Sequence, residues 1–261
     1  MPAYDVRARR SDDNLELENA AMASSSTIVI GGGGGIGRAL IGRIERTDHE
    51  TVIISRDPAN HTGLSSTSIG CDASDIEALD TAVGEVAARQ PVRGMVCLAG
   101  SILLKPAHMI SPAEWQETIA TNLTTAFACV RAAGRHMKGG GSVVLVSTVA
   151  AATGLPNHEA IAAAKAGVEG LARSAAATYA GRGLRFNVVA PGLVDTPLAE
   201  RITRSEKALE HSRKMHPLGR IGRPDDIASA IAWLLSEESD WTTGQVIGID
   251  GGLGQTRAGA S

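Results

Sequence analysis

Residues 26–40, STIVIGGGGGIGRAL, have the composition of a phosphate-binding turn. A short apolar run ends in five consecutive glycines, and a helical pattern begins at Ile36. Glycine loses more backbone freedom on folding than any other residue, so such a run fits a backbone that turns with positive φ against a ligand. Unpaired N–H groups and the positive end of a helix dipole attract a pyrophosphate there. Strand, glycine turn and helix together predict a dinucleotide site and argue against a flexible linker.

The glycines of this turn fit two different spacings. Gly32, Gly34 and Gly37 match G-x-G-x-x-G. Gly31, Gly35 and Gly37 match G-x-x-x-G-x-G equally well. The glycines alone leave the choice between these two registers open.

The residues after the second apolar run bear on the choice of dinucleotide. A carboxylate at the tip of that strand bonds the ribose 2′-hydroxyl of NAD, whereas a basic residue suits the 2′-phosphate of NADP. Ser55 occupies the tip of ETVIIS and Arg56 follows it, which favours NADP(H) over NAD(H). Asp57, about 20 residues after Gly37, is the competing ribose ligand. It precedes Pro58, however, and is expected to have left the strand.

Strands and helices that would position these groups alternate along the chain. Strands are expected at residues 27–30, 50–55, 68–71, 92–98, 142–147, 184–189 and 245–249. Helices are expected at residues 36–46, at 74–89 with Ser74 as N-cap, from the capping sequence at Ser111 to about 137 in pieces, at 159–180 and at 224–236. Continuous apolar runs such as residues 50–55 are typical of parallel strands covered on both faces.

This alternation predicts an α/β fold, a doubly wound parallel sheet of the Rossmann type. Residues 26–261 form one domain without a linker or repeat, and residues 1–25 are expected to be a mobile N-terminal extension. Ligands bind at the carboxyl edge of such a sheet. The strand tips expected to line one crevice are Gly31, Ser55, Asp72, Gly100, Ser147 and Pro191.

The bulk composition limits the classes of partner. A formal net charge of −3 gives no reason to expect nucleic acid or an anionic membrane surface. The three cysteines are far apart and form neither a disulfide framework nor a metal site. No run approaches the ~18 apolar residues of a membrane span, and the charged N-terminus is not a secretory signal. These features predict a cytoplasmic protein with reduced thiols that acts on a small molecule.

Several ordered stretches between residues 26 and 252 resemble the short-chain dehydrogenase/reductase family. IGGGGGIG resembles the family's TGxxxGIG, which selects the second of the two glycine registers, and CDASD resembles xDVTD. CLAG stands where the family has NNAG, and RFNVVAPGLVDTPL resembles RVNxxxPGxxxTP. PLGRIGRPDDIASAIAWLLS and TGQVIGIDGG match the C-terminal signature.

The resemblance implies a nicotinamide dinucleotide lying along the carboxyl edge of the sheet. It places Asp72 at the adenine and Thr196 at the nicotinamide amide. With the two residues at the tip of the second strand, the predicted cofactor-binding set is Gly31, Gly35, Ile36, Gly37, Ser55, Arg56, Asp72, Ala99, Gly100, Lys165, Pro191, Gly192 and Thr196.

The predicted catalytic set departs from the family's pattern of Ser, Tyr and Lys. Lys165 matches the lysine and Asn122 the helix asparagine, but Ile161 stands where the proton-donating tyrosine belongs. Thr148 occupies the serine position, with Ser147 adjacent. The chain's two tyrosines are elsewhere, one in the N-terminal segment and one at the far end of the lysine's helix.

Three functions are compatible with the missing phenol, whose loss typically lowers the rate by about 10²–10⁴. An oxidoreductase could use Thr148 or Ser147 to polarise the substrate, with Lys165, His158 or water as the donor. Alternatively, the substrate is a conjugated enoyl compound that is protonated at carbon by water, as in family members that lack this tyrosine. The third possibility is a catalytically silent dinucleotide-binding sensor or partner subunit. His158 itself, in PNHE, is expected to be a solvated loop residue.

Residues 195–217 fall where the family has a substrate lid. Their basic residues suit either an anionic substrate such as a CoA ester or, because glutamates are interleaved, a solvated helix face. The resemblance also implies a homo-oligomer, a dimer or tetramer, assembled through the helices that carry Asn122 and Lys165. The basic residues of this segment are Arg201, Arg204, Lys207, Arg213 and Lys214.

Overall fold

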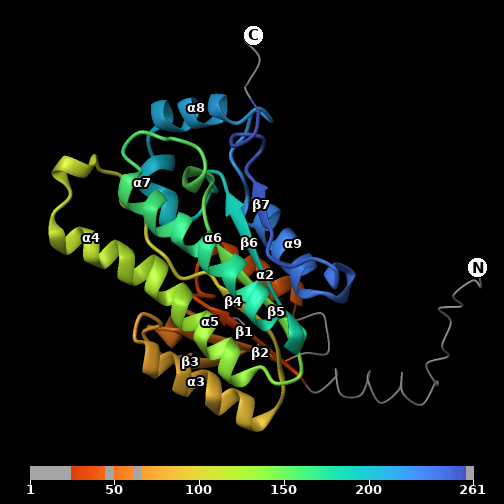
Figure 1. The fold of residues 1–261 in the computed structure, drawn as a ribbon. Coiled ribbons are helices and arrows are strands. Elements are labelled where there is room, and N and C mark those ends of the chain that lie inside the picture. Colours follow the sequence, from red (N-terminus) through yellow and green to blue (C-terminus); the bar gives the residue numbers. More distant parts are fainter. Residues whose placement is uncertain (1–24, 45–49, 62–65, 257–261) are drawn as a thin grey trace, which may run out of the picture.

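A computed structural model describes residues 25–44, 50–61 and 66–256 of the chain. Seven parallel strands form one sheet in the order β3-β2-β1-β4-β5-β6-β7 (Figure 1). The strands are β1 Ser26–Ile30, β2 Glu50–Ser55, β3 Thr67–Gly70, β4 Val92–Cys97, β5 Gly141–Val146, β6 Leu184–Pro191 and β7 Val246–Ile249. The predicted doubly wound α/β sheet is confirmed, and the strand order reverses between β1 and β4.

Helices cover both faces of this sheet (Figure 1). On one face, α2 (Gly35–Ile44) and α9 (Pro224–Leu235) pack on a core that includes Val29, Ile53 and Val144. On the other face, α3, α5 and α6 pack on a larger core that includes Phe186. These three helices are α3 Ile76–Arg89, α5 Thr125–His136 and α6 Glu159–Tyr179. Because strands such as β2 are buried on both sides, their sequences are apolar without alternation.

Capping residues determine where α4 (Pro112–Ile119) and α3 begin. The capping box predicted at Ser111 is present, with Glu114 returning a hydrogen bond, and it starts α4. The prediction for α3 was wrong by one residue, because Asp75 and not Ser74 is the N-cap. Ser74 donates instead to Asp72, at 2.8 Å from the hydroxyl, and the free Asp75 carboxylate accepts from the first-turn N–H groups.

Two short departures from regular helix affect the site. A π-helical turn, η3 (Ala120–Thr124), joins α4 to α5 and carries Asn122. After β6, the chain forms η6 (Pro197–Ala199), α7 (Glu200–Thr203) and α8 (Glu206–Met215) beyond the carboxyl ends of the strands (Figure 1). This segment corresponds to the predicted lid.

The structure bears on some of the predictions about the N-terminal segment, the cysteines and membrane-spanning helices. Residues 1–24 of the expected N-terminal extension lie outside the described residues, while Ser25 is buried and its carbonyl accepts from Glu50 N at 3.1 Å. Cys97 and Cys129 are buried, and all three cysteines are free thiols. Among the helices in the described ranges, none is both long and apolar enough to cross a bilayer.

Candidate active site

One cleft of about 640 Å³ lies at the carboxyl ends of the central strands. The glycine turn after β1, the loop after β4, the start of α6 and the lid all contribute to its wall. Of the predicted site residues, it brings together Gly31, Gly35, Ile36, Gly37, Gly100, Asn122, Ser147, Thr148, Lys165, Pro191, Gly192 and Thr196. Ser55, Arg56, Asp72 and Ala99 are not among its lining residues.

The turn after β1 has no room for a Cβ at several of its glycines. Gly31 has φ of +80°, and a Cβ on it would lie 2.7 Å from Ala99 N. A Cβ on Gly35 would lie 3.1 Å from Thr196 Cγ2, across the cleft. Gly32 faces the core instead, where a Cβ would meet Ile53 Cγ2 at 2.9 Å. The geometry therefore fits a pyrophosphate at the N-terminus of α2, with the register that uses Gly31, Gly35 and Gly37.

Lys165 is the buried cation of the cleft. Its side chain comes from α6, it is only 8% exposed, and Nζ donates to Val146 O at 2.8 Å. Burial lowers the pKa of Lys165 to about 8, an effect opposed by the nearby Cys97. An ammonium has three donors, so a single acceptor within the described residues leaves two N–H groups for ligand hydroxyls. A ribose in the cleft fits this donor set.

Asn122 acts on the loop after β4. The residue is 1% exposed, and its Oδ1 accepts from Ser101 N at 3.2 Å. Its Nδ2 donates to Ser101 Oγ at 3.1 Å and to Thr118 O at 3.0 Å. The π-helical turn thus aims the amide at the loop containing Gly100, and Asn122 positions that loop against the cleft.

Ser147 and Thr148 are not equivalent. Ser147 Oγ donates to Glu169 Oε1 at 2.8 Å, which commits its proton to a carboxylate on α6. Thr148 is half-buried, and its Oγ1 accepts from Ala150 N at 3.3 Å. The Thr148 hydroxyl therefore keeps its proton for a ligand in the cleft. Sequence reasoning did not identify Glu169.

Ile161 occupies the cleft wall where a phenol was expected from the family pattern. It is 5% exposed and offers no polar atom. Tyr179 packs its ring on Phe186, with centroids 5.6 Å apart, and does not line the cleft. Tyr4 lies outside the described residues. Within the described chain, no phenol reaches this site.

The tip of β2 carries a separate polar cluster. Ser55 Oγ lies 3.0 Å from His61 Nε2, and His61 Nδ1 lies 2.8 Å from Ser68 Oγ. Burial lowers the pKa of His61, and Arg38 adds to the effect. Arg56 is exposed beside this tip. These residues lie beyond the cleft, on the side where an adenosine would extend from the glycine turn.

Asp72, at the end of β3, is exposed and already hydrogen-bonded. Its Oδ1 accepts from Ser74 N at 3.0 Å and from Ser74 Oγ at 2.8 Å. These bonds lower the pKa of Asp72, and Arg56 contributes in the same direction. Its second oxygen, Oδ2, accepts no hydrogen bond from the described residues, so Asp72 retains an acceptor for a further donor.

The lid presents apolar side chains to the cleft and charged ones to solvent. Leu198, Ile202 and Met215 line the cleft, whereas none of the five basic residues of the segment does. Arg204 pairs with Glu200 at 2.6 Å, and Lys214 with Glu210 at 3.5 Å. Of the two interpretations of these charges, the geometry favours the solvated helix face.

Three histidines outside the predicted site set also line the cleft: His158, which the sequence offered as a possible proton donor, and His211 and His216, which it did not single out. His158 is partly exposed in the loop just before α6, where it is the N-cap residue, and it lines the cleft. His216 is 3% exposed, with Nδ1 2.6 Å from Ser212 O and Nε2 3.2 Å from Leu193 N. Its signal in the sequence was weak, because a single histidine before Pro217 has no characteristic spacing.

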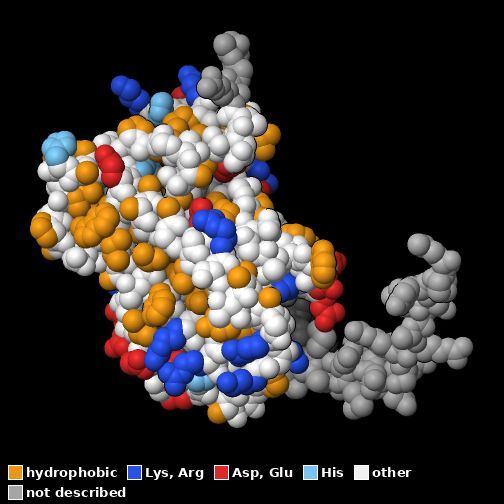
Figure 2. All heavy atoms as spheres, in the orientation of Figure 1, with side chains coloured by type: hydrophobic (Ala, Val, Ile, Leu, Met, Phe, Trp, Pro, Cys, Tyr) orange, Lys and Arg blue, Asp and Glu red, His pale blue; other side chains and the backbone are white. Residues whose placement is uncertain are grey.

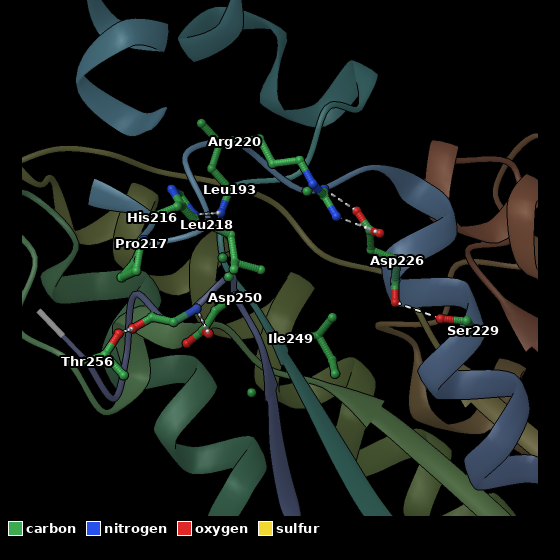
Figure 3. A pocket seen from close by; sticks show the side chains of 15 residues that line it. Leu193, His216, Pro217, Leu218, Arg220, Asp226, Ser229, Ile249, Asp250 and Thr256 are labelled. Carbon is green, nitrogen blue, oxygen red and sulfur yellow. Dashed lines mark hydrogen bonds and ion pairs between the residues drawn. The ribbon is translucent and has the colours of Figure 1, made fainter. Parts of the chain in front are cut away.

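A second cavity, of about 630 Å³, lies behind the lid (Figure 3). His216 and Leu193 line both cavities, so the His216 ring stands in the wall between them. Arg220 and Asp226 pair at its edge, with their closest atoms 2.6 Å apart (Figure 3). The carboxylate of Asp250 accepts from Gly252 N and Gly254 N, both at 2.9 Å, which folds the chain after β7 over this cavity.

The fold and the first cleft together define a dinucleotide-binding α/β protein, and similar proteins narrow the class. A family model described as enoyl-(acyl carrier protein) reductase matches residues 33–254. The chain is 35% identical over 217 residues to cis-4-hydroxycyclohexanecarboxylate dehydrogenase of Sinomonas cyclohexanicum, which covers 82% of this chain and 76% of that protein. It is 34% identical over 225 residues to the 3-oxoacyl-(acyl-carrier-protein) reductase MabA of Mycobacterium avium, covering 84% of this chain and 86% of that one.

A solved structure gives the same result. A candidate NAD(P)-dependent gluconate 5-dehydrogenase from Beutenbergia cavernae, with NADP bound at low occupancy, superposes with a TM-score of 0.81 at 30% identity. The match covers 87% of this chain and 96% of that one. The chain belongs to the short-chain dehydrogenase/reductase family, whose members are NAD(P)-dependent oxidoreductases.

Proposed function

We propose that this protein is an NAD(P)(H)-dependent oxidoreductase that moves a hydride to or from a small carbonyl or conjugated enoyl compound. The observation that carries the proposal is a single cleft in which the glycine turn, the Lys165 ammonium and the Thr148 hydroxyl meet beneath an apolar lid. A bound nicotinamide supplies or accepts the hydride. The protein's own groups hold the dinucleotide, exclude water and polarise the substrate oxygen.

Each end of the dinucleotide has residues suited to it. Backbone N–H groups at the start of α2 suit the pyrophosphate, and the two free N–H groups of Lys165 suit the nicotinamide ribose. Thr196 lies across from Gly35, within reach of a nicotinamide amide. At the other end, Asp72 has an acceptor for the adenine. These assignments agree with a cofactor laid across the reversal of strand order between β1 and β4.

NADP(H) is proposed over NAD(H) because the tip of β2 ends in Ser55 and exposed Arg56. A guanidinium and a hydroxyl can hold a 2′-phosphate, and no carboxylate occupies the tip itself. Replacing Arg56 by aspartate is expected to weaken NADPH binding by about 10-fold or more while sparing NADH, in line with the loss of a charge-assisted hydrogen bond. Fluorescence titration with the two nucleotides measures this. Equal weakening for both would remove the argument for NADP.

The substrate class follows from the apolar lid and from Ile161. An apolar wall suits an aliphatic or alicyclic body, and a conjugated enoyl compound needs no phenol because water can protonate its carbon. The relatives named above act on a cyclohexane alcohol and on 3-oxoacyl thioesters. Suitable probes are therefore 4-oxocyclohexanecarboxylate, acetoacetyl-CoA, crotonyl-CoA and 2-cyclohexenone.

A silent dinucleotide-binding protein is the second candidate, favoured by one observation: Ile161 puts an apolar wall where the acid belongs. Nucleotide titration followed by turnover of the four probes, with Ile161→Tyr in parallel, separates the candidates. Turnover of any probe by the natural protein supports the oxidoreductase. Tight NADPH binding with no turnover by either protein supports the silent one. No binding of either nucleotide would contradict both.

A further inference from the structure

We propose that His158 is the proton donor of this cleft, in place of the phenol that Ile161 lacks; the proposal rests on the oxidoreductase function above. His158 is the N-cap residue of α6, and its carbonyl accepts from Ala162 N at 2.7 Å. The helical hydrogen-bond ladder therefore begins at His158. Residues three apart on a helix share a face, and His158 and Ile161 both line the cleft.

The imidazole of His158 is held in one orientation by the backbone. Nδ1 lies 2.8 Å from Pro156 O, and a carbonyl oxygen only accepts, so Nδ1 carries a hydrogen. Nε2 has no hydrogen-bond partner within the described residues. A ring fixed through one nitrogen and free at the other is the arrangement by which histidine transfers a proton.

The turn before His158 is itself fixed in place. Asn157 has φ of +65° and is the single non-glycine residue with positive φ in the described ranges. Its carbonyl accepts from Lys105 N at 2.9 Å, and Lys105 Nζ pairs with Glu114 at 2.9 Å. Asparagine adopts the left-handed conformation more readily than other non-glycine residues, so the sequence suits this turn. These contacts hold the His158 ring at the cleft.

The other groups in the cleft are less suited to this role. Ser147 gives its proton to Glu169, and Lys165 gives one donor to Val146 O while its other two are assigned to the ribose. Both ring nitrogens of His216 are bonded to the backbone. His211 lies on α8 with no hydrogen bond from the described residues to fix its ring. Thr148 can polarise an oxygen but cannot store a proton for it.

The charged and titratable groups around His158 come from four elements. Glu159 follows it on α6, and Lys165 lies two turns further along the same helix. The Lys105–Glu114 pair lies behind the turn, and His211 faces the cleft from α8. Lys165 belongs to this set and burial lowers its pKa to about 8, so a pH profile alone does not identify the donor and must be compared between variants.

In the direction of reduction, the carbonyl carbon would receive a hydride, with its two electrons, from the reduced nicotinamide when that cofactor is bound. The carbon–oxygen π bond breaks, and the oxygen takes the proton of His158 Nε2 while Thr148 donates a hydrogen bond to it. His158 changes from imidazolium to neutral imidazole and is reprotonated by water at the cleft mouth. Oxidation follows the reverse course.

The test is His158→Gln, with His108→Gln on the exposed turn η2 as the matched control. We expect kcat/KM for the ketone probes to fall by about 10²–10⁴ in His158→Gln and to stay within about 2-fold in the control. The NADPH dissociation constant, measured by fluorescence, should stay within about 2-fold in both and confirms that each folds. The pH profile of kcat/KM for reduction should differ between the natural protein and His158→Gln, because the variant lacks the proposed donor, and should be unchanged in His108→Gln.

Two further measurements separate proton delivery from structure. Adding Ile161→Tyr to His158→Gln should restore turnover, whereas no recovery would mean that His158 serves binding and would overturn the assignment. Imidazole ¹⁵N spectra of the NADP-bound protein, assigned with His158→Gln, should show the Nε2 resonance shift when the alcohol product binds. An unmoved resonance also contradicts the proposal. Turnover unchanged in His158→Gln overturns the inference alone, whereas absence of turnover and of the ¹⁵N shift overturns it together with the oxidoreductase function.

Discussion

At the scale of single residues, Lys165 is the side chain of the cleft whose burial is most unfavourable electrostatically. Burying an ammonium without a carboxylate is unfavourable, and the fold offers one backbone carbonyl in return. A bound ligand would offset this cost, because ribose hydroxyls would accept the hydrogen bonds that the ammonium made to water in the unfolded chain. The protein therefore retains a charged side chain in its cleft at the expense of its own stability.

The first prediction concerns this cost. In the cofactor-free protein, burial holds the pKa of Lys165 at about 8, below its ordinary value of 10.5. The folded state releases the proton first, so stability should rise between about pH 8 and 10.5 as the charged form disappears. Lys165→Met should be more stable than the natural protein near pH 7 by about 3 kcal/mol, and the gap should close toward pH 10. Urea unfolding at several pH values measures this.

Lys214→Met, on the exposed side of α8, is the control and should leave the pH dependence unchanged. Parallel stability curves for Lys165→Met and the natural protein between pH 7 and 10 would mean that Lys165 is solvated, and the ribose argument would lose its basis.

At the scale of elements, the sequence predicted the strands well because strands such as β1, β2 and β5 are mainly apolar runs ended by glycine or serine. The glycine turn was equally readable, since five glycines between a strand and a helix have few uses. Individual side-chain contacts were not predictable, whether the two residues are near or distant in the sequence. The bond between Ser147 and Glu169 joins residues 22 apart, and the orientation of His158 depends on a carbonyl two residues away. No periodicity encodes either contact.

The N-cap of α3 gives a prediction at this scale. Asp75→Ala removes the acceptor for Glu77 N and Ala78 N and should lower the free energy of unfolding by about 1 kcal/mol. Ser74→Ala, one residue away, leaves the cap intact and should have a smaller effect. Urea denaturation of both variants gives the comparison. A larger loss in Ser74→Ala would mean that the cap lies where the sequence first suggested.

At the scale of the whole molecule, the surface is not uniformly polar. Figure 2 shows hydrophobic side chains gathered over α4 and the segment leading to it. The exposed apolar residues there include Met109 and Trp115, and Phe127 on the neighbouring α5 is 45% exposed. Apolar side chains exposed together on adjacent helices commonly mark an interface. This surface, over α4 and α5, supports the expectation of a homo-oligomer from the family resemblance, which implied assembly through the helices that carry Asn122 and Lys165.

Phe127→Glu tests that expectation. A charge at the centre of an apolar interface would have to be buried without a partner, so we expect the dimer or tetramer to dissociate at micromolar concentration. Light scattering with size-exclusion chromatography measures the mass. Trp241→Glu, at a residue that is 98% exposed outside these helices, is the control. If the natural protein is a monomer, the proposed oligomer is wrong. If Phe127→Glu has the same mass as the natural protein, the interface does not include Phe127.

The reversal of strand order between β1 and β4 has one more consequence. The main chain proposed to hold the dinucleotide's pyrophosphate lies on one flank of that crevice, whereas the candidates for acid–base work at residues 147–165 lie on the other flank, around β5 and α6. The two duties are thus carried by separate pieces of polypeptide. Substitutions at residues 147–161 can therefore change the proton donor without weakening nucleotide binding. The isoleucine at position 161 is a substitution of this kind.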